Sequence, residues 1–299
     1  MHEEIFQLIF YCIFTEALKW YPDNKKHNGE FLMKRIAWSS HLLMTLFLFL
    51  YQQSIASSQS DKDPITYGHY RKIYSKIIGE ERTLLIHLPL DYESSNKNYP
   101  ALYVLDGEKE VFLQSVTTTW YLRETAQKIP GYIVIGIPNT DRRRDMDTGK
   151  ENFHRFIESE LIPFIDSTYR TNDFKILCGQ SASSIFTFDS FLKNPNLFNM
   201  YILISFGLSK NSLSPYKDQI VNSKEIKRQG HKHLFFSNAK TDPYDPSGER
   251  TENAKLVYDL LKKHLPQTNQ LTYRTYDDEG HVPFPSLYDA LKGLHHEKK

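Results

Sequence analysis

Cysteine is scarce in this sequence, with two residues in 299. This scarcity excludes a disulfide-dense scaffold and a cysteine-rich zinc module. An excess of charge of either sign is also absent, because 37 Lys and Arg stand against 36 Asp and Glu and the formal net charge is +1. We therefore expect no basic surface for nucleic acid. Aromatic residues, in contrast, make up 14% of the chain, which excludes a disordered or collagen-like protein.

Long hydrophobic runs are absent as well, and two short ones lie near the N-terminus, at 5–14 and 42–51. The second follows a basic start at 33–35 and precedes small residues at Ser54 and Ala56. This order is typical of a secretory signal peptide. An apolar run of this length at ~1.5 Å per residue spans ~15 Å, about half of a bilayer core. The pattern therefore predicts a cleaved signal rather than a stable membrane span.

Residues 1–56 are accordingly interpreted as a leader, with the signal peptide over about 33–56 and cleavage after Ala56. Residues 1–32 are interpreted as upstream sequence translated in error, with Met33 as the start, because the acidic pair after His2 has the wrong charge for a signal. Residues 57–299 then form one exported domain, which we expect in the periplasm or outside the cell. Cys178 is its single cysteine, so it forms no internal disulfide.

Strand and helix patterns alternate through that domain. Residues 82–88 alternate apolar and polar side chains, as a half-buried antiparallel strand does. Compact apolar runs typical of buried parallel strands follow, and amphipathic helical patterns lie between them. The alternation indicates one α/β domain with a central, mostly parallel sheet. The expected further strands are 101–105, 132–137, 175–178, 201–205, 233–237 and 271–276, and the expected helices are 152–169 (kinked at Pro163), 184–192 and 252–265.

A candidate nucleophile lies where a strand gives way to a helix, in Gly179-Gln180-Ser181-Ala182-Ser183. The sequence is close to Gly-x-Ser-x-Gly, in which a tight strand-to-helix turn projects the serine hydroxyl above the sheet. Small residues two places away on either side let strand and helix approach. Here Ser183 replaces the second glycine. A helix N-cap is the alternative role for Ser181.

A serine nucleophile needs a base and an acid, and in this fold class they follow the serine in the order acid, then histidine. His281 is the predicted base, because it follows the last strand and the loop that ends in Gly280. The acid is expected on the loop after 233–237, where Asp242 is the first choice and Asp245 and Glu249 are the alternatives. An ordinary loop or turn residue is the competing interpretation at each position.

An oxyanion site needs two backbone N–H donors. Ala182 at the helix start is one candidate, and Gly107 or Glu108 after the strand 101–105 is the other. Three residues are candidates for contact with substrate: Arg142 for an acidic group, and Trp120 or Tyr121 for an acyl group. For Arg142 the alternative is a loop held by local ion pairs, and for the aromatic residues it is a place in the core. Histidines that could suggest a metal, His231, His233, His295 and His296, lack neighbouring carboxylate or thiolate ligands in the sequence and are interpreted as surface residues.

With these residues assembled, the chain resembles the Putative esterase family of α/β-hydrolases, which includes siderophore esterases and S-formylglutathione hydrolases. The resemblance implies Ser181 as nucleophile, His281 as base and the α/β-hydrolase fold, with helices on both faces of the sheet. The chain departs from the family at Gln180, Ser183 and Ser184, where a histidine and two glycines are usual. The resemblance covers roughly 75–285, and the matching segments are 79–82, Leu88-Pro89, 99–107, 137–145, 156–165, Tyr169-Arg170, 179–181 and Gly280-His281.

We therefore predict a serine ester hydrolase that acts through an acyl-enzyme on a small-molecule ester, such as a siderophore or an acylated sugar. The chemistry requires no cofactor. An acyltransferase that uses the same nucleophile is the first alternative. A catalytically inactive α/β-hydrolase that serves as a binding protein is the second, suggested by the altered turn at Ser183.

Overall fold

The computed structural model describes residues 44–45, 48, 66–228 and 230–296. The chain divides into two units, 1–65 and 66–299. In the first unit, the three described residues are helical. The proposed signal peptide at 33–56 otherwise lies outside the described residues, as does the segment 1–32. Within the described part of the chain, no helix combines the length and apolar character needed to cross a membrane.

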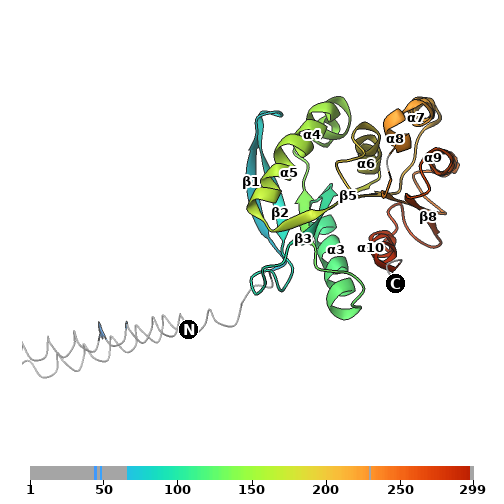
Figure 1. Ribbon diagram of the computed structural model, residues 1–299. Helices are drawn as coiled ribbons and strands as arrows, with labels where there is room; N and C mark the ends of the chain where they lie inside the picture. The colour runs from blue at the N-terminus through green and yellow to red at the C-terminus, as the bar shows by residue number, and fades with distance from the viewer. Residues whose placement is uncertain (1–43, 46–47, 49–65, 229, 297–299) are drawn as a thin grey trace, which may run out of the picture. The chain divides into compact units, whose positions relative to one another are not determined.

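An eight-stranded sheet forms the centre of the second unit (Figure 1), in the order β1-β2-β4-β3-β5-β6-β7-β8. The first two strands pair antiparallel to each other, and β2 pairs antiparallel to β4. All remaining pairs are parallel. The strands are β1 His69–Ser75, β2 Glu80–His87, β3 Tyr99–Leu105, β4 Ile133–Ile137, β5 Thr171–Gln180, β6 Met200–Ile204, β7 His233–Ala239 and β8 Gln270–Tyr276.

Helices cover both faces of this sheet. The α-helices are α3 Lys109–Trp120, α4 Lys150–Phe156, α5 Ile162–Thr168, α6 Ala182–Lys193, α7 Lys210–Asn222, α8 Lys224–Arg228, α9 Glu249–His264 and α10 Ser286–His296. Single π-helical turns occupy η1 Tyr121–Thr125, η2 Arg144–Thr148 and η3 Ile157–Leu161. Apolar residues of α3 and α10 pack on one face, and those of α4 to α9 pack on the other.

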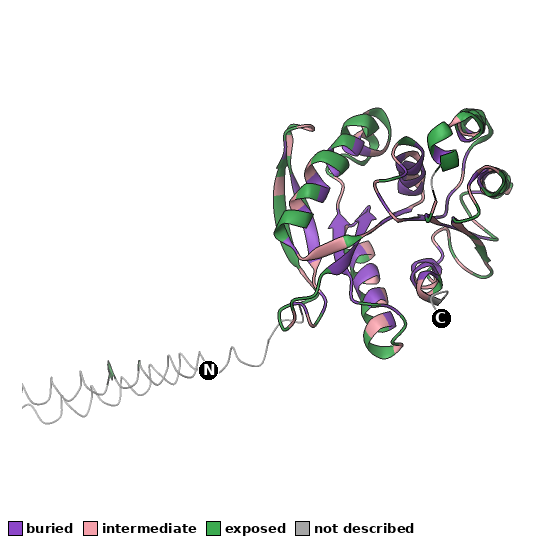
Figure 2. Ribbon diagram, in the orientation of Figure 1, coloured by how far each residue is buried: buried purple, intermediate pink, exposed green. Residues whose placement is uncertain are grey.

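The central strands are buried on both faces because their side chains alternate between two cores (Figure 2). In β3, for example, Leu102 and Val104 join the core under α3 and α10, and Tyr103 and Leu105 join the opposite one. This is the arrangement that the continuous apolar runs predict. The seven expected strands are confirmed, with small differences at their ends. The sheet order and the helices on both faces make this an α/β-hydrolase fold.

The expected helix at 152–169 consists of α4, η3 and α5, which follow one another without a break. Pro163 lies in the first turn of α5, directly after the wider π turn, so it interrupts the regular helix without ending it. Strand β1 was not predicted from the sequence. Most of its residues are exposed and polar, as an edge strand allows, and so it carries no apolar pattern.

Candidate active site

Ser181 lies in the turn between β5 and α6, with φ 55° and ψ −121°. A positive φ at a residue other than glycine costs about 1–3 kcal/mol and persists where the surrounding structure enforces it. Gly179 makes the turn possible, because a Cβ there would lie 2.2 Å from the carbonyl oxygen of Ser183 and 2.4 Å from Thr187 Oγ1. The sequence therefore needs glycine at 179 for the strand and the helix to meet.

Ser183, the departure from the second glycine, has a structural reason. Its side chain is fully buried, accepts a hydrogen bond from the N–H of Gln180 at 2.8 Å and donates one to the carbonyl of the same residue at 2.9 Å. The neighbouring Ser184 hydroxyl donates to the carbonyl of Ser181 at 2.5 Å. The two hydroxyls thus form hydrogen bonds with backbone groups of Gln180 and Ser181, which glycines at 183 and 184 could not form. These bonds hold the altered turn in shape.

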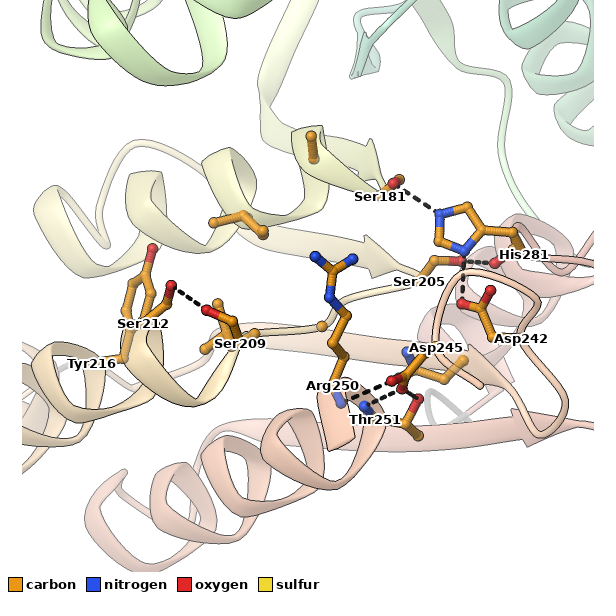
Figure 3. A pocket seen from close by; sticks show the side chains of 15 residues that line it. Ser181, Ser205, Ser209, Ser212, Tyr216, Asp242, Asp245, Arg250, Thr251 and His281 are labelled. Atoms are coloured by element: carbon orange, nitrogen blue, oxygen red, sulfur yellow. Dashed lines mark hydrogen bonds and ion pairs between the residues drawn. The ribbon is translucent and has the colours of Figure 1, made fainter. Parts of the chain in front are cut away.

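The structure brings Ser181, His281 and Asp242 together (Figure 3). The serine Oγ lies 2.8 Å from His281 Nε2, and His281 Nδ1 lies 2.6 Å from Asp242 Oδ2. A carboxylate only accepts hydrogen bonds, so Nδ1 carries the hydrogen and Nε2 is free to accept the hydrogen of the serine hydroxyl. The three residues come from the ends of β5, β7 and β8, at the carboxyl edge of the sheet.

Further contacts hold the histidine and the aspartate in place. The N–H of Tyr244 donates to Asp242 Oδ1 at 2.8 Å, and the Tyr244 ring packs edge-on against the imidazole, 4.9 Å between centroids. The hydroxyl of Ser205, directly after β6, donates to the carbonyl of His281. Neither Ser205 nor Tyr244 was predicted. A polar residue at the end of a buried strand is the one signal that points to Ser205.

Asp245 and Glu249, the alternatives for the acid, have other partners. Asp245 Oδ2 accepts hydrogen bonds from the N–H and the hydroxyl of Thr251, at 2.8 and 2.9 Å. A Glu249 oxygen accepts the N–H of Lys210 at 3.0 Å. Geometry thus favours Asp242. Gly280 has no positive φ, and an added Cβ would meet nothing within 4 Å, so the loop before His281 does not require glycine.

Of the two candidates for the second oxyanion donor, Gly107 is wrong. Its N–H donates to the carbonyl of Ile137 at 3.1 Å, and its missing side chain serves close packing against that strand end. The N–H of Glu108 donates to no acceptor among the described residues, and β3 lies next to β5, so the following loop lies beside the turn at Ser181. Ala182 is the first residue of α6, where an N–H has no partner within the helix.

Arg142 does not line the cavity at Ser181, contrary to the prediction of substrate contact. It forms a two-pronged ion pair with Asp106, with both N–O distances at 2.8 Å. Burial raises the pKa of Asp106, but the hydrogen bonds from Arg142 and Asn139 outweigh it and hold the pKa below its ordinary value. This ion pair fixes the loop after β3, which carries Glu108.

Trp120 and Tyr121 do not line the cavity either. Helix α3 begins at the carboxyl end of β3 and runs back along the sheet, so its last residues lie about 18 Å from its start. Both side chains are about half exposed, and the Tyr121 ring lies 6.3 Å from that of Tyr288 in α10. Nothing in the cavity beside Ser181 therefore supports the expected acyl-binding role of either residue, which stays a prediction. No apolar pattern between 107 and 120 indicated helix α3, which places both residues away from the cavity.

A cavity of about 240 Å³ opens beside Ser181 and His281. Its walls come from α6, from the loop after β6 with the start of α7, and from the loop between β7 and α9. Within 66–228 and 230–296, no three His, Cys, Asp or Glu side chains gather as a metal site would require. The residues that line the cavity are Ser181, Ala182, Ile185, Ser205, Gly207, Leu208, Ser209, Ser212, Tyr216, Asn238, Asp242, Asp245, Arg250, Thr251 and His281.

Comparison with known proteins finds a family match over most of the chain. Residues 75–281 match the family described as Putative esterase. The Bacillus subtilis (strain 168) protein described as Uncharacterized protein YjcH is 28% identical over 238 residues, which cover 75% of this chain and 95% of that protein.

Two solved structures are similar to this fold. An IroE-like serine hydrolase from Shewanella oneidensis has a TM-score of 0.69 and 26% identity, over 76% of this chain and 80% of that one. The siderophore hydrolase EstA from Aspergillus nidulans has a TM-score of 0.65 and 21% identity, over 78% and 97% of the two chains.

Proposed function

The chain belongs to the Putative esterase family, and from this premise we propose that it is a serine ester hydrolase that forms an acyl-enzyme on Ser181. One observation supports the mechanism above all others: a continuous chain of hydrogen bonds from Ser181 through His281 to Asp242. A serine hydroxyl is a weak nucleophile unless a base lies within hydrogen-bond reach. The proposed substrate is a small-molecule ester, such as a siderophore ester or an acylated sugar.

In the first half of the reaction, the Ser181 oxygen attacks the carbonyl carbon of the ester while His281 Nε2 takes the hydroxyl proton. The carbonyl electron pair moves onto oxygen, where the N–H groups of Ala182 and Glu108 donate hydrogen bonds. The imidazolium then passes its proton to the alcohol oxygen as the ester C–O bond breaks. The acyl group remains on Ser181.

In the second half, water takes the place of the alcohol. His281 removes a proton from the water as its oxygen bonds to the acyl carbon, and the proton then returns to Ser181 when the bond to Oγ breaks. Asp242 accepts the Nδ1 hydrogen throughout and stabilises the imidazolium. Every group that takes part in these reaction steps is supplied by the chain itself, by the substrate or by water, so the mechanism requires no cofactor.

Hydrolysis of 4-nitrophenyl esters by the purified chain tests the proposal. We expect turnover by the parent protein and a loss of at least about 1000-fold in kcat for Ser181→Ala, by analogy with other serine triads. Ser94→Ala, which removes an exposed hydroxyl outside the cavity, is the matched control and should keep the activity of the parent protein. Equal rates for Ser181→Ala and the parent protein would reject the mechanism.

Transfer of the acyl group to an alcohol, the alternative activity, shares every step up to the acyl-enzyme. Product analysis with added alcohol acceptors distinguishes the two, because a transferase yields new esters in preference to free acid. The inactive binding protein is disfavoured by the intact contacts between Ser181, His281 and Asp242. Failure of the parent protein to react with any serine-directed probe would favour it.

Export is part of the same proposal. The basic start, the apolar core at 42–51 and the small residues at Ser54 and Ala56 support a signal peptide and a periplasmic or secreted enzyme. Mass spectrometry of the protein recovered from its native compartment should find a mature N-terminus at Ser57. An N-terminus before Met33 would contradict both the cleavage and the proposed start.

A further inference from the structure

Arg250, the second residue of α9, is one of the residues that line the cavity beside Ser181. Its backbone is held by Asp245, whose Oδ1 accepts the Arg250 N–H at 3.1 Å. Gly207 gives its side chain room, because a Cβ on that glycine would lie 3.0 Å from Arg250 Cβ. Figure 3 shows the side chain extending from the start of α9 into the space between Ser181 and Tyr216. The guanidinium thus lies in the cavity that Ser181 also lines.

The guanidinium has no partner among the described residues, although most charged groups around it are paired. Asp245 is occupied by backbone N–H groups and the Thr251 hydroxyl. Asp242 is bound to His281, and Glu249 accepts the N–H of Lys210. The hydroxyl of Tyr216, on the opposite wall, donates to Asp189. None of these carboxylates forms an ion pair with the Arg250 side chain.

Arg250 is exposed to solvent at the wall of a cavity that Ser181 also lines, so a substrate bound there can contact its guanidinium. A guanidinium presents several N–H donors in one plane, in a geometry that matches a carboxylate or phosphate. Because hydrogen bonds to a charged partner are stronger than neutral ones, such a contact changes the rate for a charged substrate by roughly 10- to 100-fold. A neutral ester gains nothing comparable from it.

We propose that Arg250 is a specificity-determining residue that selects esters carrying a carboxylate or another anionic group close to the ester bond. The inference rests on the serine hydrolase function proposed above and names the class of substrate for the same site. It assigns the cavity between α6, α7 and α9 to the charged part of the substrate. The roles of Ser181, His281 and Asp242 do not depend on it.

Matched pairs of esters test this assignment. The first pair is mono-4-nitrophenyl adipate and methyl 4-nitrophenyl adipate. The acyl part ends in a carboxylate in the first compound and in a neutral methyl ester in the second. The second pair is 4-acetoxybenzoate and its methyl ester, which place the same difference in the alcohol part. For each pair, the ratio of kcat/KM for the anionic ester to kcat/KM for the neutral one is measured for the parent protein, Arg250→Gln and Arg250→Lys. Arg155→Gln, in helix α4 and outside the cavity, is the control.

We expect the parent protein to favour the anionic member of at least one pair, and Arg250→Gln to lower that ratio at least tenfold, mainly through KM. Arg250→Lys should keep part of the preference, and Arg155→Gln should keep all of it. A ratio that does not change in Arg250→Gln, or a parent protein with no preference in either pair, would overturn the inference and leave the proposed function standing. Hydrolysis of none of the four esters would instead count against the proposed function, and the inference would fall with it.

Discussion

The Nδ1 atom of His281 lies 2.6 Å from Oδ2 of Asp242, although 39 residues separate them along the chain. Because the carboxylate can only accept, the contact decides which imidazole nitrogen carries the hydrogen. The other nitrogen, Nε2, is left facing the Ser181 hydroxyl at 2.8 Å. Asp242 therefore sets the tautomer that a general base needs.

Asp242→Asn should lower kcat by about 10³- to 10⁴-fold, because an amide can donate to Nδ1 and stabilise the wrong tautomer. Steady-state hydrolysis of a 4-nitrophenyl ester measures the loss. Glu249→Gln is the matched control, since this exposed carboxylate at the start of α9 accepts the N–H of Lys210 and does not contact His281. Equal losses in the two variants would show that Asp242 has no special relation to the histidine.

Gly179→Ala should destabilise the fold by about 2–4 kcal/mol, because the new Cβ would overlap the carbonyl oxygen of Ser183, which is backbone and cannot move aside cheaply. Urea unfolding followed by fluorescence measures the difference in free energy. Gly280→Ala is the control, since nothing lies within 4 Å of an added Cβ there. Its free energy of unfolding should change by less than about 0.5 kcal/mol. Tolerance of alanine at 179 would mean that the turn at Ser181 is looser than described.

His154 should make the protein less stable in mild acid. His154 lies in α4, where its ring stacks on Phe186 of α6, and burial lowers its pKa from 6.5 to about 4. The unfolded chain therefore binds a proton between pH 6.5 and 4 that the folded chain does not, and stability falls as the pH falls through this window. The full effect is about 3 kcal/mol, at 1.36 kcal/mol per pKa unit.

Chemical denaturation at a series of pH values measures this effect. His154→Gln, which cannot titrate, should lose less stability between pH 6.5 and 4 than the parent protein loses. His231→Asn, at an exposed position, is the control and should keep the parent slope. An identical acid response in His154→Gln would assign the loss to other groups.

Substitutions of Arg82 and Asp145, which form an ion pair, should have strongly coupled effects on the free energy of unfolding. Both side chains are 1% exposed, and the nitrogen–oxygen distance is 2.6 Å. Arg82→Met leaves Asp145 buried with Arg144 as its remaining ion-pair partner, and should cost about 3–5 kcal/mol. Adding Asp145→Leu should recover part of the loss, and a double-mutant cycle in urea measures the coupling. Additive losses would mean that the two groups stabilise the fold independently.

Much of the sheet could be predicted from the sequence, because strands buried on both faces are continuous apolar runs, as in 101–105 and 201–205. Strand β1 could not, since an exposed edge strand carries polar residues on both faces. Helix α3 was missed for a different reason. Its threonines and other β-branched residues are poor helix formers, and packing against β3 and β4 decides its structure.

The positions of Ser181 and His281 follow from fold order and turn chemistry, both of which can be read along the chain. The choice of Asp242 over Asp245 and Glu249 depends on contacts that only the structure shows. What surrounds these residues cannot be read along the chain either, because it depends on contacts between distant segments. The sequence does not show that Arg142 forms an ion pair with Asp106. Nor does it show that the Gly107 N–H donates to the carbonyl of Ile137, or that the Ser205 hydroxyl donates to the carbonyl of His281. The direction of Arg250 depends likewise on Gly207, more than 40 residues before it.

The most direct measurement identifies the residue that a fluorophosphonate modifies, by intact-mass analysis followed by peptide mapping of the purified protein. The predicted result is one adduct per chain, on the peptide that contains Ser181, with much slower formation in His281→Ala and none in Ser181→Ala. An adduct on another serine of the cavity, such as Ser209 or Ser212, or no adduct on the folded parent protein, would contradict Ser181 as the nucleophile.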